Sequence, residues 1–163
     1  MSESLQVRYH DPVLQGESLV ETAVDIHTID GEEWLVRWYH SSHDTDLMVW
    51  LDSKGLVGHF QLNVGGQIVD WSRAAGIQSG CIVEIELGHP EAAETIKFDS
   101  VLSSSNMRAA EAVLKNAIAL KKPVREHLLS SLHDVRGQDV RKSMQSSRTR
   151  FWSRFKRWTK PAA

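Results

Sequence analysis

The sequence is 163 residues long, has a formal net charge of −2 at pH 7 and is 41% hydrophobic, which is typical of one globular domain with an appendage. The single cysteine, Cys81, excludes an internal disulfide framework and a cysteine-based zinc ribbon, and it suits a reducing compartment. No apolar stretch reaches the ~18 residues of a membrane-spanning helix, and the first residues lack the pattern of a secretory signal, so we expect a cytoplasmic protein.

The net charge conceals an unequal distribution along the chain. Residues 1–135 contain 10 Lys and Arg against 20 Asp and Glu, a charge of −10. Residues 136–163 contain 9 Lys and Arg against one acid, a charge of +8. An acidic domain followed by a basic tail indicates what kind of partner the protein binds, and it carries no information on the fold. We expect a loosely ordered N-terminus at 1–18, a single α+β domain at 19–136 and a basic amphipathic tail at 137–163.

Strands are predicted in the first half of the domain. Thr22–Ile26 is a modest candidate, whereas Glu33–Tyr39 alternates with a period of two, which is typical of a strand. Leu47–Leu51 is apolar on both faces, and Leu56–Val64 alternates again. Gly65 and Gly66 then supply two residues that tolerate positive φ, as a two-residue hairpin turn requires.

Three more strand candidates follow this turn. Ile68–Trp71 returns as the partner strand, and Cys81–Leu87 places Cys81 on its apolar face. Thr95–Val101 is a weaker candidate. Because parallel pairing needs crossovers of about a dozen residues or more, these short connections predict antiparallel neighbours. We expect an antiparallel meander of five to six strands.

The period changes to that of a helix at Ser103. The run Ser103–Asn106 is a good N-cap region, and apolar residues follow it at helical spacing. Pro123 ends this helix and is suited to open the next, for which Gly137 is a suitable C-terminal residue. The chain is therefore predicted to be α+β, with two helices packed on the sheet and a basic amphipathic tail after them.

A cluster of metal-ligand residue types lies between two predicted strands. It consists of His40, His43, Asp44 and Asp46. A catalytic metal needs about three protein ligands with an open position, but serines and a threonine in the same stretch are typical of a polar hairpin turn. We predict the turn, and we keep a small metal-dependent enzyme centred on these four residues as the alternative.

Other signatures of catalysis are weak. No phosphate-binding loop, dinucleotide-binding glycine pattern or nucleophile elbow occurs in the sequence. Cys81 is interpreted as a small buried core residue rather than a nucleophile. Four tryptophans fall within the strands, where they either pack in the core or form an exposed aromatic patch for a partner: Trp34, Trp38, Trp50 and Trp71.

The tail has the pattern of a basic amphipathic helix. At 100° per residue Phe151, Phe155 and Trp158 fall within about 60° of one another. This pattern indicates packing on the domain itself, docking to a protein partner with an apolar groove, or docking to an anionic membrane. Segregated aromatic and basic residues fit nucleic acid less well. The candidate binding residues are Arg150, Phe151, Trp152, Arg154, Phe155, Arg157 and Trp158.

These observations predict a non-catalytic binding or adaptor protein of the cytoplasm. It would engage a protein partner or an anionic membrane surface, as a peripheral protein, through its basic aromatic tail or its Trp-rich sheet. This interpretation requires no cofactor, no metal and no catalytic residue. The alternative, a small metal-dependent enzyme, would use the cluster at residues 40–46.

Overall fold

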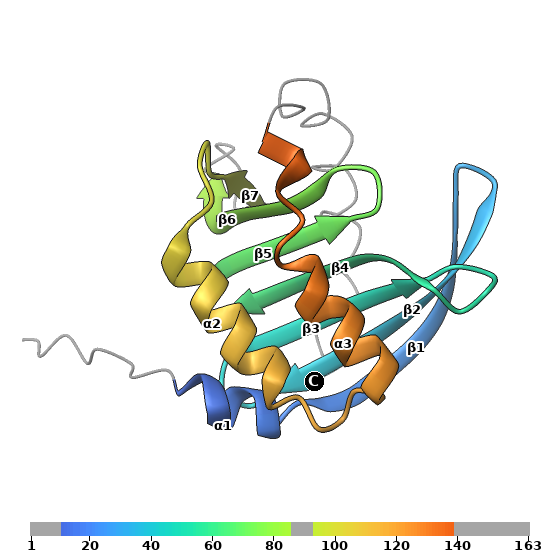
Figure 1. Ribbon diagram of the computed structural model, residues 1–163, viewed down its shortest axis with the longest axis horizontal. Helices are drawn as coiled ribbons and strands as arrows, with labels where there is room; N and C mark the ends of the chain where they lie inside the picture. The colour runs from blue at the N-terminus through green and yellow to red at the C-terminus, as the bar shows by residue number, and fades with distance from the viewer. Residues whose placement is uncertain (1–10, 86–92, 139–163) are drawn as a thin grey trace, which may run out of the picture.

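A computed structural model of the chain describes residues 11–85 and 93–138. It is an α+β fold in which seven strands form one antiparallel sheet, each strand pairing with the next along the chain (Figure 1). The predicted class and meander are confirmed, whereas the predicted number of five to six strands is wrong. The strands are β1 (Val20–Ile29), β2 (Glu32–Ser41), β3 (Thr45–Leu51), β4 (Val57–Val64), β5 (Gln67–Ser72), β6 (Gly76–Ile85) and β7 (Ala93–Phe98).

The edge strand β1 shows why the predicted number of strands was too low. Its side chains do not alternate between buried and exposed in the way that marks an inner strand, and Val24 and Ile26 remain exposed. The strand exists because a tight turn returns it to β2, with Asp30 and Gly31 at φ values of 51° and 81°. Positive φ at both central residues matches the right-handed twist of the flanking strands. Pairing across this turn therefore defines β1.

The helices are α1 (Pro12–Glu17), α2 (Ser104–Lys115) and α3 (Lys122–Ser131), and a 3₁₀ helix, η1, spans Val135–Gln138. Both α2 and α3 lie over one side of the sheet (Figure 1). The predicted cap of α2 is confirmed, because the Ser103 hydroxyl accepts a hydrogen bond from the Asn106 backbone N–H at 3.3 Å. No helix within the described residues is long and apolar enough to span a membrane.

Helix α1 lies in the segment that was expected to be loosely ordered. The Asp11 carboxylate caps it by accepting a hydrogen bond from the Val13 backbone N–H at 3.0 Å, and Pro12 is its first residue. The helix packs against α2 so closely that a Cβ at Gly16 would overlap the carbonyl oxygen of Val113. A tertiary contact therefore orders this six-residue helix.

Helix α3 ends at Ser131, several residues before the C-terminal position predicted at Gly137. The chain is drawn to the sheet at Asp134, whose backbone carbonyl accepts a hydrogen bond from the Ile77 backbone N–H at 2.7 Å. This bond to β6 replaces the next helical turn, so the predicted end of α3 is wrong.

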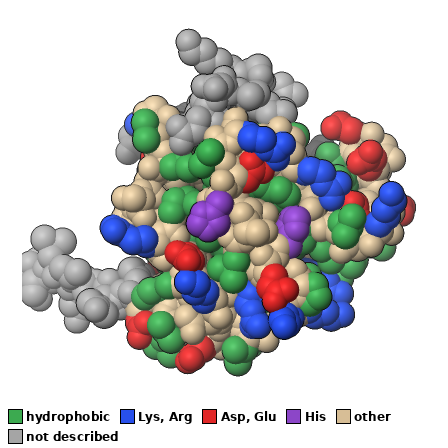
Figure 2. Space-filling model, in the orientation of Figure 1, with side chains coloured by type: hydrophobic (Ala, Val, Ile, Leu, Met, Phe, Trp, Pro, Cys, Tyr) green, Lys and Arg blue, Asp and Glu red, His purple; other side chains and the backbone are tan. Residues whose placement is uncertain are grey.

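The main core lies between the sheet and the two long helices. Fully buried side chains from both layers meet there, including Phe60 and Leu62 of β4, Leu114 of α2 and Leu128 of α3. Figure 2 shows this side from outside, with acidic and basic side chains interspersed over the surface. The helix-bearing side is thus a solvated surface of mixed charge.

Candidate functional site

The four strand tryptophans divide between the two faces of the sheet. Successive side chains of a strand point to opposite faces. Trp71 belongs to the core beneath α2 and α3, whereas Trp34, Trp38 and Trp50 lie on the other side. We call that side the Trp face. Its buried cluster consists of Val36, Met48 and Trp50, with Trp34 and Trp38 packed against it.

Trp50 is the central residue of the Trp face. Its side chain is 2% exposed, and its ring stacks on His59 of β4 with a centroid separation of 4.3 Å and an interplanar angle of 18°. Trp34 reaches the same strand, because a Cβ at Gly58 would overlap the Trp34 ring. The absence of a side chain at Gly58 lets the indole approach the backbone. The aromatic surface therefore extends from β2 to β4.

A polar cluster adjoins these rings. The Asp70 carboxylate, on a residue 2% exposed, contacts His59 Nε2 at 2.7 Å and accepts a hydrogen bond from Gln61 Nε2 at 3.2 Å. A carboxylate beside an imidazole orients the ring, as it does in catalytic triads. Here the same imidazole is also stacked on Trp50. The contacts fix His59 as part of the surface.

Sequence reasoning missed this cluster. His59 has no neighbouring residue at a metal-ligand spacing, and no local pattern connects it to Asp70. The signal was available in the strand pattern, since His59, Gln61 and Asn63 alternate with apolar residues on one face of a predicted strand. The hairpin at Gly65 then determines which residues of β5 they meet.

Carboxylates dominate the charge of the Trp face. Alternation and register direct six carboxylates to this side, and no lysine or arginine of the seven described strands points there. Glu84 and Glu94 are direct partners across β6 and β7, an arrangement of like charges that destabilises a sheet unless a cation lies near. The face therefore favours cationic neighbours. The six are Asp25, Glu32, Asp46, Asp70, Glu84 and Glu94.

The cluster at residues 40–46 forms the hairpin turn between β2 and β3. His40 and Asp46 are cross-strand partners, with His40 Nδ1 at 2.6 Å from Asp46 Oδ1. His43 and Asp44 lie in the turn itself, where Asp44 has a φ of 56°. The His43 carbonyl accepts a hydrogen bond from Gln15 Nε2 at 3.1 Å, which ties the turn to α1. The structure brings His40 and Asp46 together.

No group of three or more His, Cys, Asp or Glu within residues 11–85 and 93–138 is arranged to hold a metal ion. The tail residues proposed for binding, Arg150 to Trp158, lie outside the described residues. The hypothesis that they form a docking element stays a prediction.

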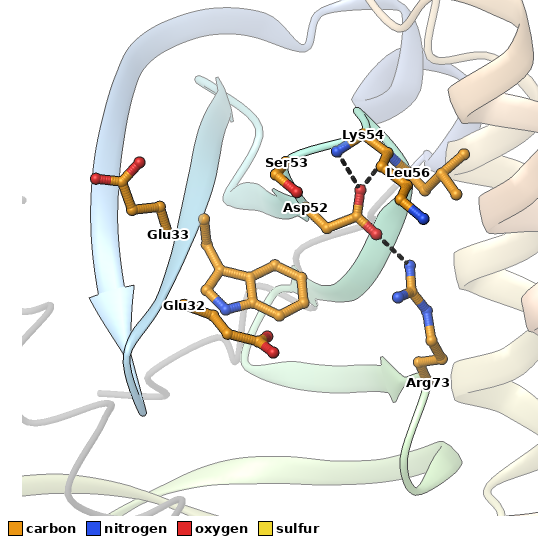
Figure 3. A pocket seen from close by; sticks show the side chains of 8 residues that line it. Glu32, Glu33, Asp52, Ser53, Lys54, Leu56 and Arg73 are labelled. Carbon is orange, nitrogen blue, oxygen red and sulfur yellow. Dashed lines mark hydrogen bonds and ion pairs between the residues drawn. The ribbon is translucent and has the colours of Figure 1, made fainter.

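A hollow of about 370 Å³ opens beside the turn between β3 and β4 (Figure 3). Asp52 on its wall accepts hydrogen bonds from the Lys54 and Leu56 backbone N–H groups, both at 2.9 Å, and from Arg73 at 3.0 Å. The Leu56 N–H, with Arg73 and Lys54, lowers the pKa of Asp52 below its ordinary value. These bonds use the carboxylate to hold the turn, so we assign the hollow a structural role.

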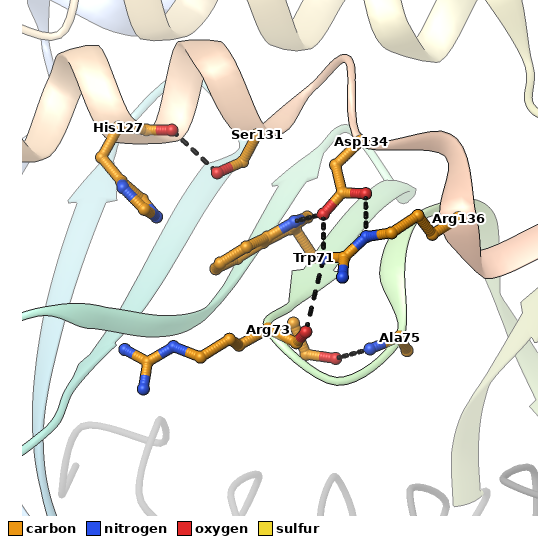
Figure 4. A network of polar contacts seen from close by, with 8 residues as sticks. Trp71, Arg73, Ala75, His127, Ser131, Asp134 and Arg136 are labelled. Carbon is orange, nitrogen blue, oxygen red and sulfur yellow. Dashed lines mark hydrogen bonds and ion pairs between the residues drawn. The ribbon is translucent and has the colours of Figure 1, made fainter.

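A second polar network joins the end of α3 to β5 (Figure 4). Asp134 accepts hydrogen bonds from Trp71 Nε1 at 3.0 Å and from two nitrogens of Arg136, each at 2.7 Å. Arg136 and Trp71 hold the pKa of Asp134 well below its ordinary value. The His127 ring meets Trp71 edge-on at 5.3 Å, and burial lowers the pKa of His127. This network anchors the helical layer on the sheet.

The Asp134 network predicts a pH-dependent stability. A depressed carboxyl pKa stabilises the fold above the unfolded value, near 4, and the stabilisation is lost as pH falls toward the folded value. Asp134→Asn is expected to lower the free energy of unfolding at pH 7 by about 1–2 kcal/mol, since Arg136 is exposed and its ion pair is screened. Urea denaturation should show the deficit shrinking below pH ~4. An equal deficit at pH 7 and pH 2.5 would contradict this role.

Comparison with known protein families, curated proteins and solved structures finds no match to this chain. The residues of the Trp face are therefore the basis on which a function can be proposed.

Proposed function

We propose that the protein is a non-catalytic binding protein of the adaptor type, and that the Trp face is its binding surface. The observation that carries this proposal is the combination of half-buried Trp34 and Trp38 with six carboxylates on a side where the described strands place no lysine or arginine. The function requires no cofactor, and we place it in the cytoplasm because a single cysteine suits a reducing compartment.

The chemistry of the face indicates the kind of partner. Tryptophan side chains supply large apolar contact area and are frequent binding hot spots. Their rings attract lysine and arginine, and surrounding carboxylates steer basic groups toward the surface. A basic amphipathic segment of a partner protein with large apolar anchors would complement both the tryptophan rings and the carboxylates. An anionic membrane would be repelled by the carboxylates of this face.

A titration of the full chain tests the proposal. The probe is a fluorescent 18-residue helical peptide of designed sequence, with Arg and Lys on one side and Phe and Trp on the other. We expect the dissociation constant to rise about tenfold or more in Trp34→Ala/Trp38→Ala, as loss of hot-spot residues implies. Binding should also weaken with added salt, because exposed charge attraction is screened over about 8–10 Å.

The matched control is Val24→Ser/Ile26→Ser. These two side chains are exposed on the opposite side of the sheet, so the change should leave peptide binding unaltered. An equal loss of peptide affinity in both double variants, or no loss of affinity in the tryptophan variant, would place the binding surface elsewhere.

A further inference from the structure

Side chains of the Trp face are buried more deeply than their neighbours on that face explain. Ile68 is 0% exposed, although its cross-strand partners are Asn63 on β4 and Gly80 on β6. Glycine contributes no side chain, and a fully buried residue normally touches six or more others. Because α2 and α3 lie on the opposite side, the face requires another cover.

Three segments of the chain lie outside the described residues and are candidates to cover the Trp face. The negative charge of the face distinguishes between them. Residues 86–92 contain two acids and no Lys or Arg, so the carboxylates of the face repel them. Residues 1–10 contain one acid and one base, and they lead into α1, which packs against α2. Residues 139–163 contain eight Lys and Arg against one acid, together with the aromatic side of the predicted helix. Only this last segment complements both the carboxylates and the aromatic cluster of the face.

The C-terminal segment is also long enough. Residue 138 ends η1, which contacts β6, and β6 is three strand spacings, about 14 Å, from β3. A linker of residues 139–149 spans up to about 36 Å when extended, which exceeds the ~10 Å thickness of a sheet layer. A helix of about 12 residues is about 18 Å long and crosses four strands.

We infer that residues 139–163 dock on the Trp face of their own chain. Phe151, Phe155 and Trp158 lie against the aromatic cluster, and the basic side chains lie among the carboxylates. The regulatory consequence rests on the proposed function: the tail occupies the surface that a partner needs, so a partner segment binds by displacing it.

The first test is carbodiimide cross-linking of the full chain, which joins a carboxylate directly to a lysine that touches it. We expect cross-links from Lys142, Lys156 or Lys160 to the carboxylates of the Trp face, and not to Glu111 or Glu126 on the helix-bearing side. An equal mixture of ¹⁵N-labelled and unlabelled protein separates links within one chain from links between copies. Mixed-label links would assign the face to a second copy and overturn the inference.

The second test measures competition with the same designed peptide. Phe151→Ser/Phe155→Ser/Trp158→Ser keeps every charge of the tail and removes its apolar anchors. We expect the variant to bind the peptide about tenfold or more tightly than the wild type, because a tethered competitor acts at an effective concentration near millimolar. The control, Ser147→Ala/Ser153→Ala/Thr159→Ala, changes three tail residues outside these anchors and should bind as the wild type does.

The two tests separate the inference from the proposed function. Absent cross-links, with tight peptide binding in wild type and variant alike, would overturn the docked tail and leave the function standing. Cross-links within one chain, with no peptide binding even in the triple-serine variant, would support docking and overturn the function. Absent cross-links together with binding of the full chain to phosphatidylserine vesicles would make a membrane the target of the tail and overturn the inference.

Discussion

Replacing Trp50 by alanine is expected to lower the free energy of unfolding by about 3–5 kcal/mol, the range for removing a large buried aromatic side chain. The indole is 2% exposed, stacks on His59 and packs with Val36 and Met48. Its loss leaves a cavity on the Trp face that neighbouring strands cannot close without moving. Urea denaturation followed by far-ultraviolet circular dichroism measures the change.

The control is Trp38→Ala on the same face. Trp38 is half-buried and is packed against the cluster rather than within it. Its removal exposes less new surface, so we expect a loss of about 1–2 kcal/mol. Equal losses at the two positions would show that the cluster is not centred on Trp50.

The double change Gly65→Val/Gly66→Val is expected to lower the free energy of unfolding by about 2–4 kcal/mol, because each position would carry roughly 1–2 kcal/mol of backbone strain. These residues form the turn between β4 and β5 at φ values of 58° and 89°. A β-branched side chain resists positive φ, and strain here also loosens the register that places His59 and Gln61 beside Asp70.

Gln67→Val tests whether the effect comes from the turn. Gln67 is the first residue of β5, is exposed and has no positive φ. The same side chain introduced there should leave the stability unchanged within about 0.5 kcal/mol. A double glycine variant as stable as the wild type would contradict the hairpin as the determinant of this register.

The position of the Trp face, which we propose as the binding surface, was only partly predictable. A Trp-rich sheet was expected from the strand pattern, but the sequence did not show which of the four tryptophans pack in the core and which form a patch for a partner. The structure separates Trp71, which donates its N–H to Asp134 in the helix-bearing layer, from the three tryptophans of the Trp face. A shift of one residue in strand register reverses the face of every side chain, so the division depends on long-range pairing.

The sequence by itself determined the local elements. The period of two in Glu33–Tyr39 and Leu56–Val64, the glycine pair and the cap at Ser103 predicted β2, β4, the hairpin and the start of α2, because each depends on neighbouring residues. Only the tertiary structure decided the rest. Helix α1 is ordered by its contact with α2, and the end of α3 by Asp134 on β6. The pairing of His59 with Asp70, eleven residues apart, follows from the register of two strands. Such contacts join residues that no local pattern connects, and their stability comes from burial between the elements they join.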